Sequence, residues 1–261
     1  MTIKTETKNQ IATVTLSRVE VHNAFNDEML KSLIKTFSTL GNDENIRAII
    51  LQAEGKSFCA GADLSWMKST ANYTYDENLK DAMQLAEMFK TIYKCPKPVI
   101  GRIQGTAIGG GVGLVSVCDF SCALDSAKFS LSEVKIGLIP AVISPFVLRK
   151  IPLSHAKRYF LTGERIDAHE AKRIGLISEV ASSEADLNQK INIWTEHILS
   201  GGKEAIKICK KMIDEVSSID LEESLILTTE QIAKLRVWKE AQEGMKAFLE
   251  KRQPLWNKNQ V

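Results

Sequence analysis

Apolar positions along the first part of the chain alternate between strand spacing and helix spacing. Residues 3–17 carry strand spacing and predict two strands joined by a turn at residues 8–10. Residues 46–53 form a continuous apolar run, which predicts a buried strand. Between these strands, helical spacing begins after Asn26 or Asp27, and either side chain can cap a helix N-terminus.

The rest of the chain changes from mixed spacing to helical spacing alone. Residues 66–75 carry neither spacing and predict a loop, whereas residues 75–94 predict a helix. This pattern predicts an α/β fold with a core over residues 1–200 and a helical region over residues 201–261. Further elements are expected as short strands at residues 120–123 and 177–180, and as helices over residues 184–199, 203–216, 221–235 and 238–251.

One stretch, Gly105 to Asp119, turns from an apolar strand into a buried helix through the triplet Gly109-Gly110-Gly111. A helix that starts at glycines leaves backbone N–H groups unpaired at the positive end of its dipole, with no Cβ in the way. Such a turn can hold a phosphate, a carboxylate or a developing oxyanion, although the glycines could equally serve close packing alone. No Gly-Lys-Ser/Thr follows and the spacing is not that of a dinucleotide fingerprint, which disfavours phosphate.

A second stretch of small residues, Gly55 to Leu64, follows the strand predicted at residues 46–53. Considered by itself, it indicates a plain strand-to-loop junction. Together with the glycine triplet it supplies a second backbone N–H group, and two converging N–H groups form an oxyanion hole. The sequence therefore favours a site that stabilises negative charge on an oxygen atom.

Composition and charge exclude several other classes of protein. The 261 residues include 34 Lys and Arg against 32 Asp and Glu, so no nucleic-acid partner is expected. No apolar run has membrane-spanning length and no signal peptide is visible, which predicts no membrane partner. The 5 cysteines are unclustered, which predicts reduced thiols in a cytoplasmic protein, and no pattern indicates a metal site.

Three motifs together resemble the crotonase (enoyl-CoA hydratase/isomerase) superfamily. They are the run Ser57 to Leu64, the spacing Gly105-x4-Gly110-Gly111, and Leu138-Ile139-Pro140 after Glu133, and the similarity extends from residue 11 to residue 252. The resemblance implies a crotonase-like spiral of β-β-α units with a C-terminal helical trimerisation region. It also implies a homo-trimer, or a hexamer of two trimers, and an acyl-CoA thioester substrate. Coenzyme A is then part of the substrate, and no separate cofactor is expected.

The resemblance also assigns roles to individual residues. The N–H groups of Ala62 and Gly110 would donate to the thioester oxygen, and Glu133 would transfer protons. Hydratases of the family with two glutamates carry the other one three residues after Gly110, where this chain has Gly113. Substrate contacts are implied for Ala24, Ala60, Asp63, Leu64, Gly109, Gly113, Phe248 and Lys251.

Several of these residues have plainer interpretations. Glu133 could lie on the surface, as glutamates usually do, but in a pocket its burial would raise its pKa toward the range useful for proton transfer. Asp63 after Gly-Ala is typical of a helix cap. Phe248 and Lys251 could belong to an amphipathic terminal helix with Lys251 in water, or they could contact CoA in a neighbouring subunit, with Lys251 near the phosphates.

Finer features are similar to the bacterial methylglutaconyl-CoA hydratases of leucine breakdown, and to relatives acting on isoprenoid glutaconyl-CoA esters. They lie in residues 108–116, 129–134 and 139–145, where Ile143-Ser144-Pro145 replaces the Gly-Gly-Thr of many crotonases. The expected activity is hydration of an enoyl-CoA thioester with a branched or carboxylated acyl group such as 3-methylglutaconyl-CoA. An isomerase needs only one base and an oxyanion hole, so it stays an alternative, as does a non-catalytic acyl-CoA-binding protein.

The glycine at position 113 suggests a further hypothesis about which acyl groups the site admits. A glycine in place of a glutamate removes a charge and would leave room beside the acyl chain. The site would then admit a substrate carboxylate, which a second glutamate would repel. The partner of that carboxylate would be a Lys or Arg that the sequence does not identify.

Overall fold

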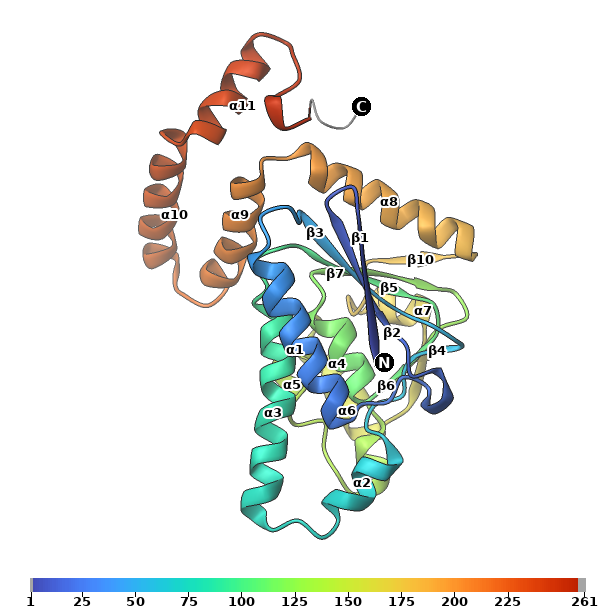
Figure 1. Cartoon of the computed structure of the whole chain (residues 1–261). Coiled ribbons are helices and arrows are strands. Elements are labelled where there is room, and N and C mark those ends of the chain that lie inside the picture. Colours follow the sequence, from blue (N-terminus) through green and yellow to red (C-terminus); the bar gives the residue numbers. More distant parts are fainter. Residues whose placement is uncertain (1, 258–261) are drawn as a thin grey trace.

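The computed structural model describes residues 2–257 and confirms most of the expected N-terminal elements (Figure 1). Strands β1 (Ile3–Lys8) and β2 (Ile11–Leu16) pair antiparallel, and β2 pairs in parallel with β3 (Ala48–Ala53). Helix α1 (Asp27–Asn42) begins after Asn26, whose side chain accepts a hydrogen bond from the backbone N–H of Met29. Asn26, rather than Asp27, is therefore the cap.

The described strands form two sheets that the chain visits in turn. The larger has the order β1-β2-β3-β5-β7-β10 and the smaller the order β4-β6-β8-β9. After β3 the chain supplies β4, after β5 it supplies β6, and after β7 it supplies β8, so each turn adds one strand to each sheet. This arrangement confirms the predicted spiral of β-β-α units. The additional strands are β4 (Ser57–Cys59), β5 (Val99–Ile103), β6 (Thr106–Ile108), β7 (Phe120–Leu124), β8 (Lys128–Ser130), β9 (Arg165–Asp167) and β10 (Glu179–Ala181).

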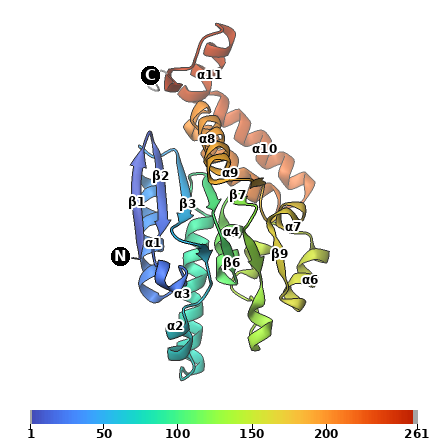
Figure 2. The same ribbon diagram turned by 90° about the vertical axis from the view of Figure 1, so that its right-hand side faces the viewer.

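Helices pack beside the strands and carry the buried apolar residues inward. Helix α3 (Tyr75–Tyr93) lies alongside α1, and a capping box between Thr74 and Glu77 fixes its start (Figure 2). The predicted loop over residues 66–75 is wrong in its first half, where α2 (Leu64–Thr70) forms. Helix α2 buries little apolar surface and starts at the capping side chain of Asp63, so hydrophobic spacing could not reveal it.

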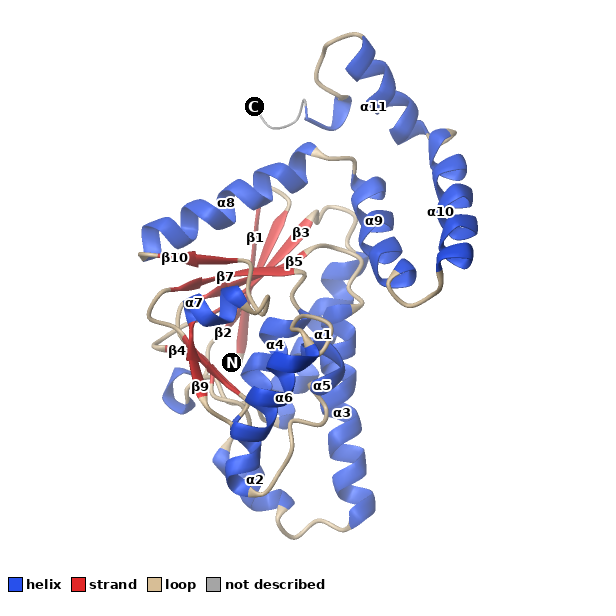
Figure 3. Cartoon of the chain, turned by 180° about the vertical axis from the view of Figure 1, so that it is seen from behind, coloured by secondary structure: helices blue, strands red, loops and turns tan. Residues whose placement is uncertain are grey.

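The last third is helical, and its end projects from the core. Helices α10 and α11 lie apart from the strands in Figure 1 and Figure 3. They leave large apolar side chains exposed, such as Ile226, Phe248 and Leu249. The remaining helices are η1 (Val19–Val21), α4 (Gly110–Val117), η2 (Ser132–Ile136), α5 (Ser144–Val147), α6 (Leu153–Thr162), α7 (Ala168–Arg173), α8 (Glu184–Ser200), α9 (Lys203–Val216), α10 (Leu221–Arg236), α11 (Lys239–Leu249) and η3 (Leu255–Asn257).

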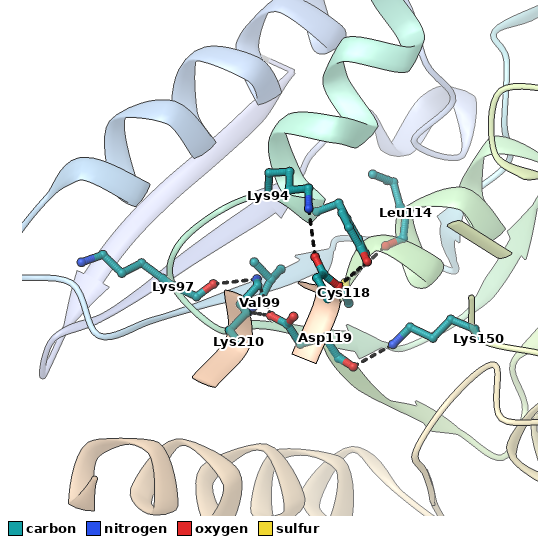
Figure 4. A network of polar contacts seen from close by, with 10 residues as sticks. Lys94, Lys97, Val99, Leu114, Cys118, Asp119, Lys150 and Lys210 are labelled. Atoms are coloured by element: carbon teal, nitrogen blue, oxygen red, sulfur yellow. Dashed lines mark hydrogen bonds and ion pairs between the residues drawn. The ribbon is translucent and has the colours of Figure 1, made fainter. Parts of the chain in front are cut away.

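A polar network around Asp119 fastens α9 to the core (Figure 4). Lys210 of α9 donates to Asp119 Oδ2 at 2.7 Å and to the carbonyl of Lys97 at 3.0 Å. The same carboxylate oxygen accepts from the backbone N–H of Val99, and Lys150 donates to the carbonyl of Asp119. Because these contacts cross residue 201, α9 is coupled to the core. The predicted division at that residue stays a prediction, and residues 258–261 of the expected helical region lie outside the described residues.

Two wider features are absent from residues 2–257. No helix there is long and apolar enough to cross a membrane. The same residues contain no group of three or more His, Cys, Asp or Glu side chains placed to hold a metal ion.

Candidate active site

Three short parallel strands of the smaller sheet end at one edge. Ser57 of β4 pairs with Thr106 of β6, and Ile108 of β6 pairs with Ser130 of β8. The chain leaving β4 reaches Ala62, the chain leaving β6 reaches Gly110, and the chain leaving β8 reaches Glu133. The topology therefore brings together the two expected N–H donors and the expected acid from positions far apart in the sequence.

The two donor turns touch each other. A Cβ atom built on Gly61 would lie 3.6 Å from the amide nitrogen of Gly110, so the two backbones are in contact there. Gly110 is the first residue of α4, where helix geometry provides no acceptor for its N–H group. Within residues 2–257, no group accepts a hydrogen bond from the N–H of Ala62 or of Gly110. Both amides are therefore free to bind an oxygen atom.

Gly109 has the backbone conformation that makes this turn possible. Its φ of 52° and ψ of −116° lie in a region that residues with a side chain rarely adopt. A Cβ at Gly109 would also lie 2.8 Å from Glu133 Oε1, so the carboxyl group rests directly on the glycine backbone. Only glycine allows the donor turn and the carboxyl group to approach this closely.

Glu133 lies on η2 and is partly buried. Its Oε2 atom is buried and has no hydrogen-bond partner among the described residues. Burial raises the pKa of Glu133 above its ordinary value of 4.5, because the charged form loses hydration. A buried acceptor without a protein partner is suited to hold a water molecule, and a raised pKa suits proton transfer.

A cavity of about 510 Å³ opens beside these groups. Ala60, Ala62, Gly109, Gly110 and Glu133 line it, as does Leu64, whose side chain is exposed at the rim. Most other side chains in its wall are apolar, which suits an acyl chain. They include Phe25, Trp66, Met67, Leu85, Ile108, Ile136, Leu138, Ile139, Val142 and Ile143.

Comparison with known proteins decides the family. The family model for enoyl-CoA hydratase/isomerase matches residues 6–259. The chain belongs to the enoyl-CoA hydratase/isomerase family. The crystal structure of an enoyl-CoA hydratase from Shewanella pealeana is 37% identical, with a TM-score of 0.94, and the match covers 98% of this chain and 96% of that one. An enoyl-CoA hydratase from Mycobacterium smegmatis is 30% identical, with a TM-score of 0.93 and coverage of 98% and 99%.

A curated relative supports the same family membership. The short-chain-enoyl-CoA hydratase of Clostridium acetobutylicum is 31% identical over 249 residues, covering 95% of this chain and 94% of that protein. Membership confirms the expected superfamily, the fold and the nature of the chain as an enzyme of enoyl-CoA chemistry. The methylglutaconyl-CoA subgroup stays a prediction.

The expectation that Gly113 leaves room in this hydratase/isomerase site is wrong. Gly113 is buried in α4 and does not line the cavity. A Cβ atom there would lie 2.4 Å from Ile143 Cγ2 and 2.8 Å from Phe89 Cε1, so these side chains already fill the space. The two positions at which the chain departs from the family pattern, Gly113 and Ile143, therefore lie in contact.

Asp63 and Ala24 are not among the residues that line the cavity. The Asp63 carboxylate caps α2 through the N–H of Ser65 and pairs with Arg18 at 2.8 Å. Desolvation raises the pKa of Asp63, but the Ser65 and Arg18 contacts outweigh it and the pKa is lowered overall. Arg18 also donates to the carbonyl of Ala24. These contacts confirm the capping role that the sequence offered for Asp63, and its expected substrate contact stays a prediction. Arg18 is a partner that the sequence did not indicate.

Phe248 lies on α11 and Lys251 just after it, in a part of the chain that supplies no residue to this cavity. Neither lines it, and Phe248 is 83% exposed. The expected contact of these two residues with CoA, in the same subunit or a neighbouring one, stays a prediction.

Among the wall residues that sequence reasoning missed are Trp66 on α2 and Asp81 on α3. Trp66 Nε1 donates to Asp81 Oδ1 at 3.0 Å. The predicted loop over residues 66–75 concealed Trp66, and a polar residue on an amphipathic helix gives no sign that it faces a cavity.

Proposed function

We propose that this enzyme hydrates an enoyl-CoA thioester whose acyl group is short and branched. The acyl group is either carboxylated, as in 3-methylglutaconyl-CoA, or uncharged, as in 3-methylcrotonyl-CoA. The observation that carries the proposal is the buried, unpartnered Oε2 atom of Glu133 beside the free N–H groups of Ala62 and Gly110. Each of these groups matches a step of hydration.

In the proposed mechanism, the thioester oxygen accepts hydrogen bonds from Ala62 and Gly110. Glu133 takes a proton from a water molecule as the water oxygen attacks Cβ. The electrons of the double bond move onto the thioester oxygen, and the two N–H groups stabilise the resulting enolate, each contributing roughly 3–4 kcal/mol. The proton then moves from Glu133, or from the same water, to Cα.

Mass analysis tests this function against its alternatives. The enzyme is incubated with crotonyl-CoA, 3-methylcrotonyl-CoA, 3-methylglutaconyl-CoA and a 3-enoyl-CoA. We expect at least one branched 2-enoyl substrate to gain the mass of one water molecule. Conversion of the 3-enoyl-CoA without a mass change would instead identify an isomerase, which the single glutamate also permits. Binding without any conversion would identify a non-catalytic relative.

The raised pKa of Glu133 gives an expected pH profile. Glu133 acts as the base only when it is ionised, so kcat/KM falls as the pH falls through its pKa. Because burial raises that pKa, the acid limb should lie above pH 4.5. The measurement is kcat/KM for the best substrate across the acid range, in buffers in which the enzyme stays folded. A limb at or below 4.5 would show that a different group titrates.

We also propose that the enzyme forms a homo-trimer or a hexamer through its C-terminal helices. The exposed apolar side chains of α10 and α11, and the position of these helices apart from the strands in Figure 1, support this proposal. Deletion of the chain from Leu235 onward is expected to break the oligomer and to weaken CoA binding. Sedimentation of the truncated protein is the measurement, and an intact trimer would rule out the deleted part, which contains α11, as the assembly element.

A further inference from the structure

The cavity contains a second acidic side chain that the proposed mechanism does not use. Asp81 of α3 is partly buried, and one of its carboxyl oxygens accepts the hydrogen bond from Trp66. Among residues 2–257, no group donates to its other oxygen. The neighbouring wall residues Leu64, Met67 and Leu85 are apolar. A carboxyl group is therefore held in an apolar acyl-binding wall with one oxygen free.

The charged groups near Asp81 do not compensate the negative charge of its carboxylate. Burial raises the pKa of Asp81, the Trp66 bond lowers it, and the negative charge of Asp27 on α1 raises it further. The other charged residues of the described cavity wall are Glu133 and Lys135. The Cε atom of Lys135 lies against Gly163, 3.3 Å from the position of a Cβ atom built on that glycine. Because Lys135 is exposed, water screens its charge.

We propose that Asp81, oriented by Trp66, sets the charge preference of the acyl pocket and disfavours an acyl group that carries a carboxylate. This inference rests on the proposed function, because it chooses between the two acyl groups offered there. An acyl chain that fills the cavity displaces water, and two negative charges then share a space of low dielectric. The uncharged branched acyl group is the preferred one.

Two saturated thioesters test the preference without catalysis. Isovaleryl-CoA and 3-methylglutaryl-CoA differ by one carboxylate, and calorimetry gives the Kd of each for the full chain. We expect the wild type to bind the carboxylated ligand about tenfold more weakly, which corresponds to about 1.4 kcal/mol. Asp81→Asn keeps an acceptor for Trp66 and removes the charge, so the ratio of the two Kd values should fall about tenfold.

Asp76→Asn is the matched control. It removes the same charge from the first turn of the same helix, at a position outside the cavity wall, and should leave the ratio unchanged. Three outcomes would each overturn the inference. The wild type could bind both ligands equally, the ratio could stay unchanged in Asp81→Asn, or both ligands could fail to bind. If the ratio changes as expected but no substrate is hydrated, the proposed function fails while the role of Asp81 stands.

Discussion

Replacing Glu133 by Gln is expected to lower turnover by roughly 10²–10⁴-fold, the usual contribution of a positioned acid–base group. Gln has nearly the same shape, so its side chain can still rest on Gly109, but it cannot take a proton from water. Acyl-CoA binding should persist, because the cavity and the two free N–H groups are unchanged. Steady-state kinetics with the best substrate, together with calorimetric titration of its saturated counterpart, measure the two effects separately.

Glu28→Gln provides a matched control for this variant. Glu28 is exposed on α1 and does not line the cavity, so its replacement should leave turnover and binding near those of the wild type. Near-normal turnover in Glu133→Gln would mean that another group transfers the proton. Asp81, the other carboxyl group of the cavity wall, would then be the first residue to examine. Loss of binding together with turnover would instead indicate that Glu133 supports the fold of the site.

The sequence predicted those parts of the site that can be recognised from neighbouring residues alone. Gly109 and Gly110 could be recognised because an unpaired helix start needs no distant partner to be identified. The hydrophobic pattern could not predict the smaller sheet, since β4, β6 and β8 each have only three residues, too few to establish strand spacing. Their pairing is nevertheless what brings Ala62, Gly110 and Glu133 to one edge.

Contacts between distant residues account for the remaining errors. The sequence showed Gly113 and Ile143 as two separate departures from the family pattern, but it could not show that they touch. The Trp66–Asp81 bond joins two helices, one of which was expected to be a loop. A pattern along the chain reports which face of an element is buried, whereas the partner on that face depends on packing in three dimensions.

Introducing glutamate at Gly113 is expected to destabilise the enzyme by about 3 kcal/mol or more, rather than to shift its substrate preference. The Cβ alone would overlap Ile143 Cγ2 at 2.4 Å and Phe89 Cε1 at 2.8 Å, and the carboxylate would have to enter a buried site. Urea unfolding of Gly113→Glu measures the loss. A stability equal to that of the wild type would mean that the space can open, and the hypothesis of a vacant place beside the acyl chain would return.

A double-mutant cycle shows whether Ile143 is the obstacle. Gly113→Ala adds only the Cβ, and overpacking of this kind typically costs about 1–3 kcal/mol. Ile143→Ala removes Cγ2 and leaves a cavity at a cost of about 2–5 kcal/mol. If the two residues exchange volume, the double variant loses less stability than the sum, because each change relieves the other. Additive losses would instead assign the clash to Phe89. A favourable coupling would mean that Ile143 is one of the obstacles to a side chain at position 113, beside Phe89. A second glutamate at position 113 would then require a smaller residue at position 143.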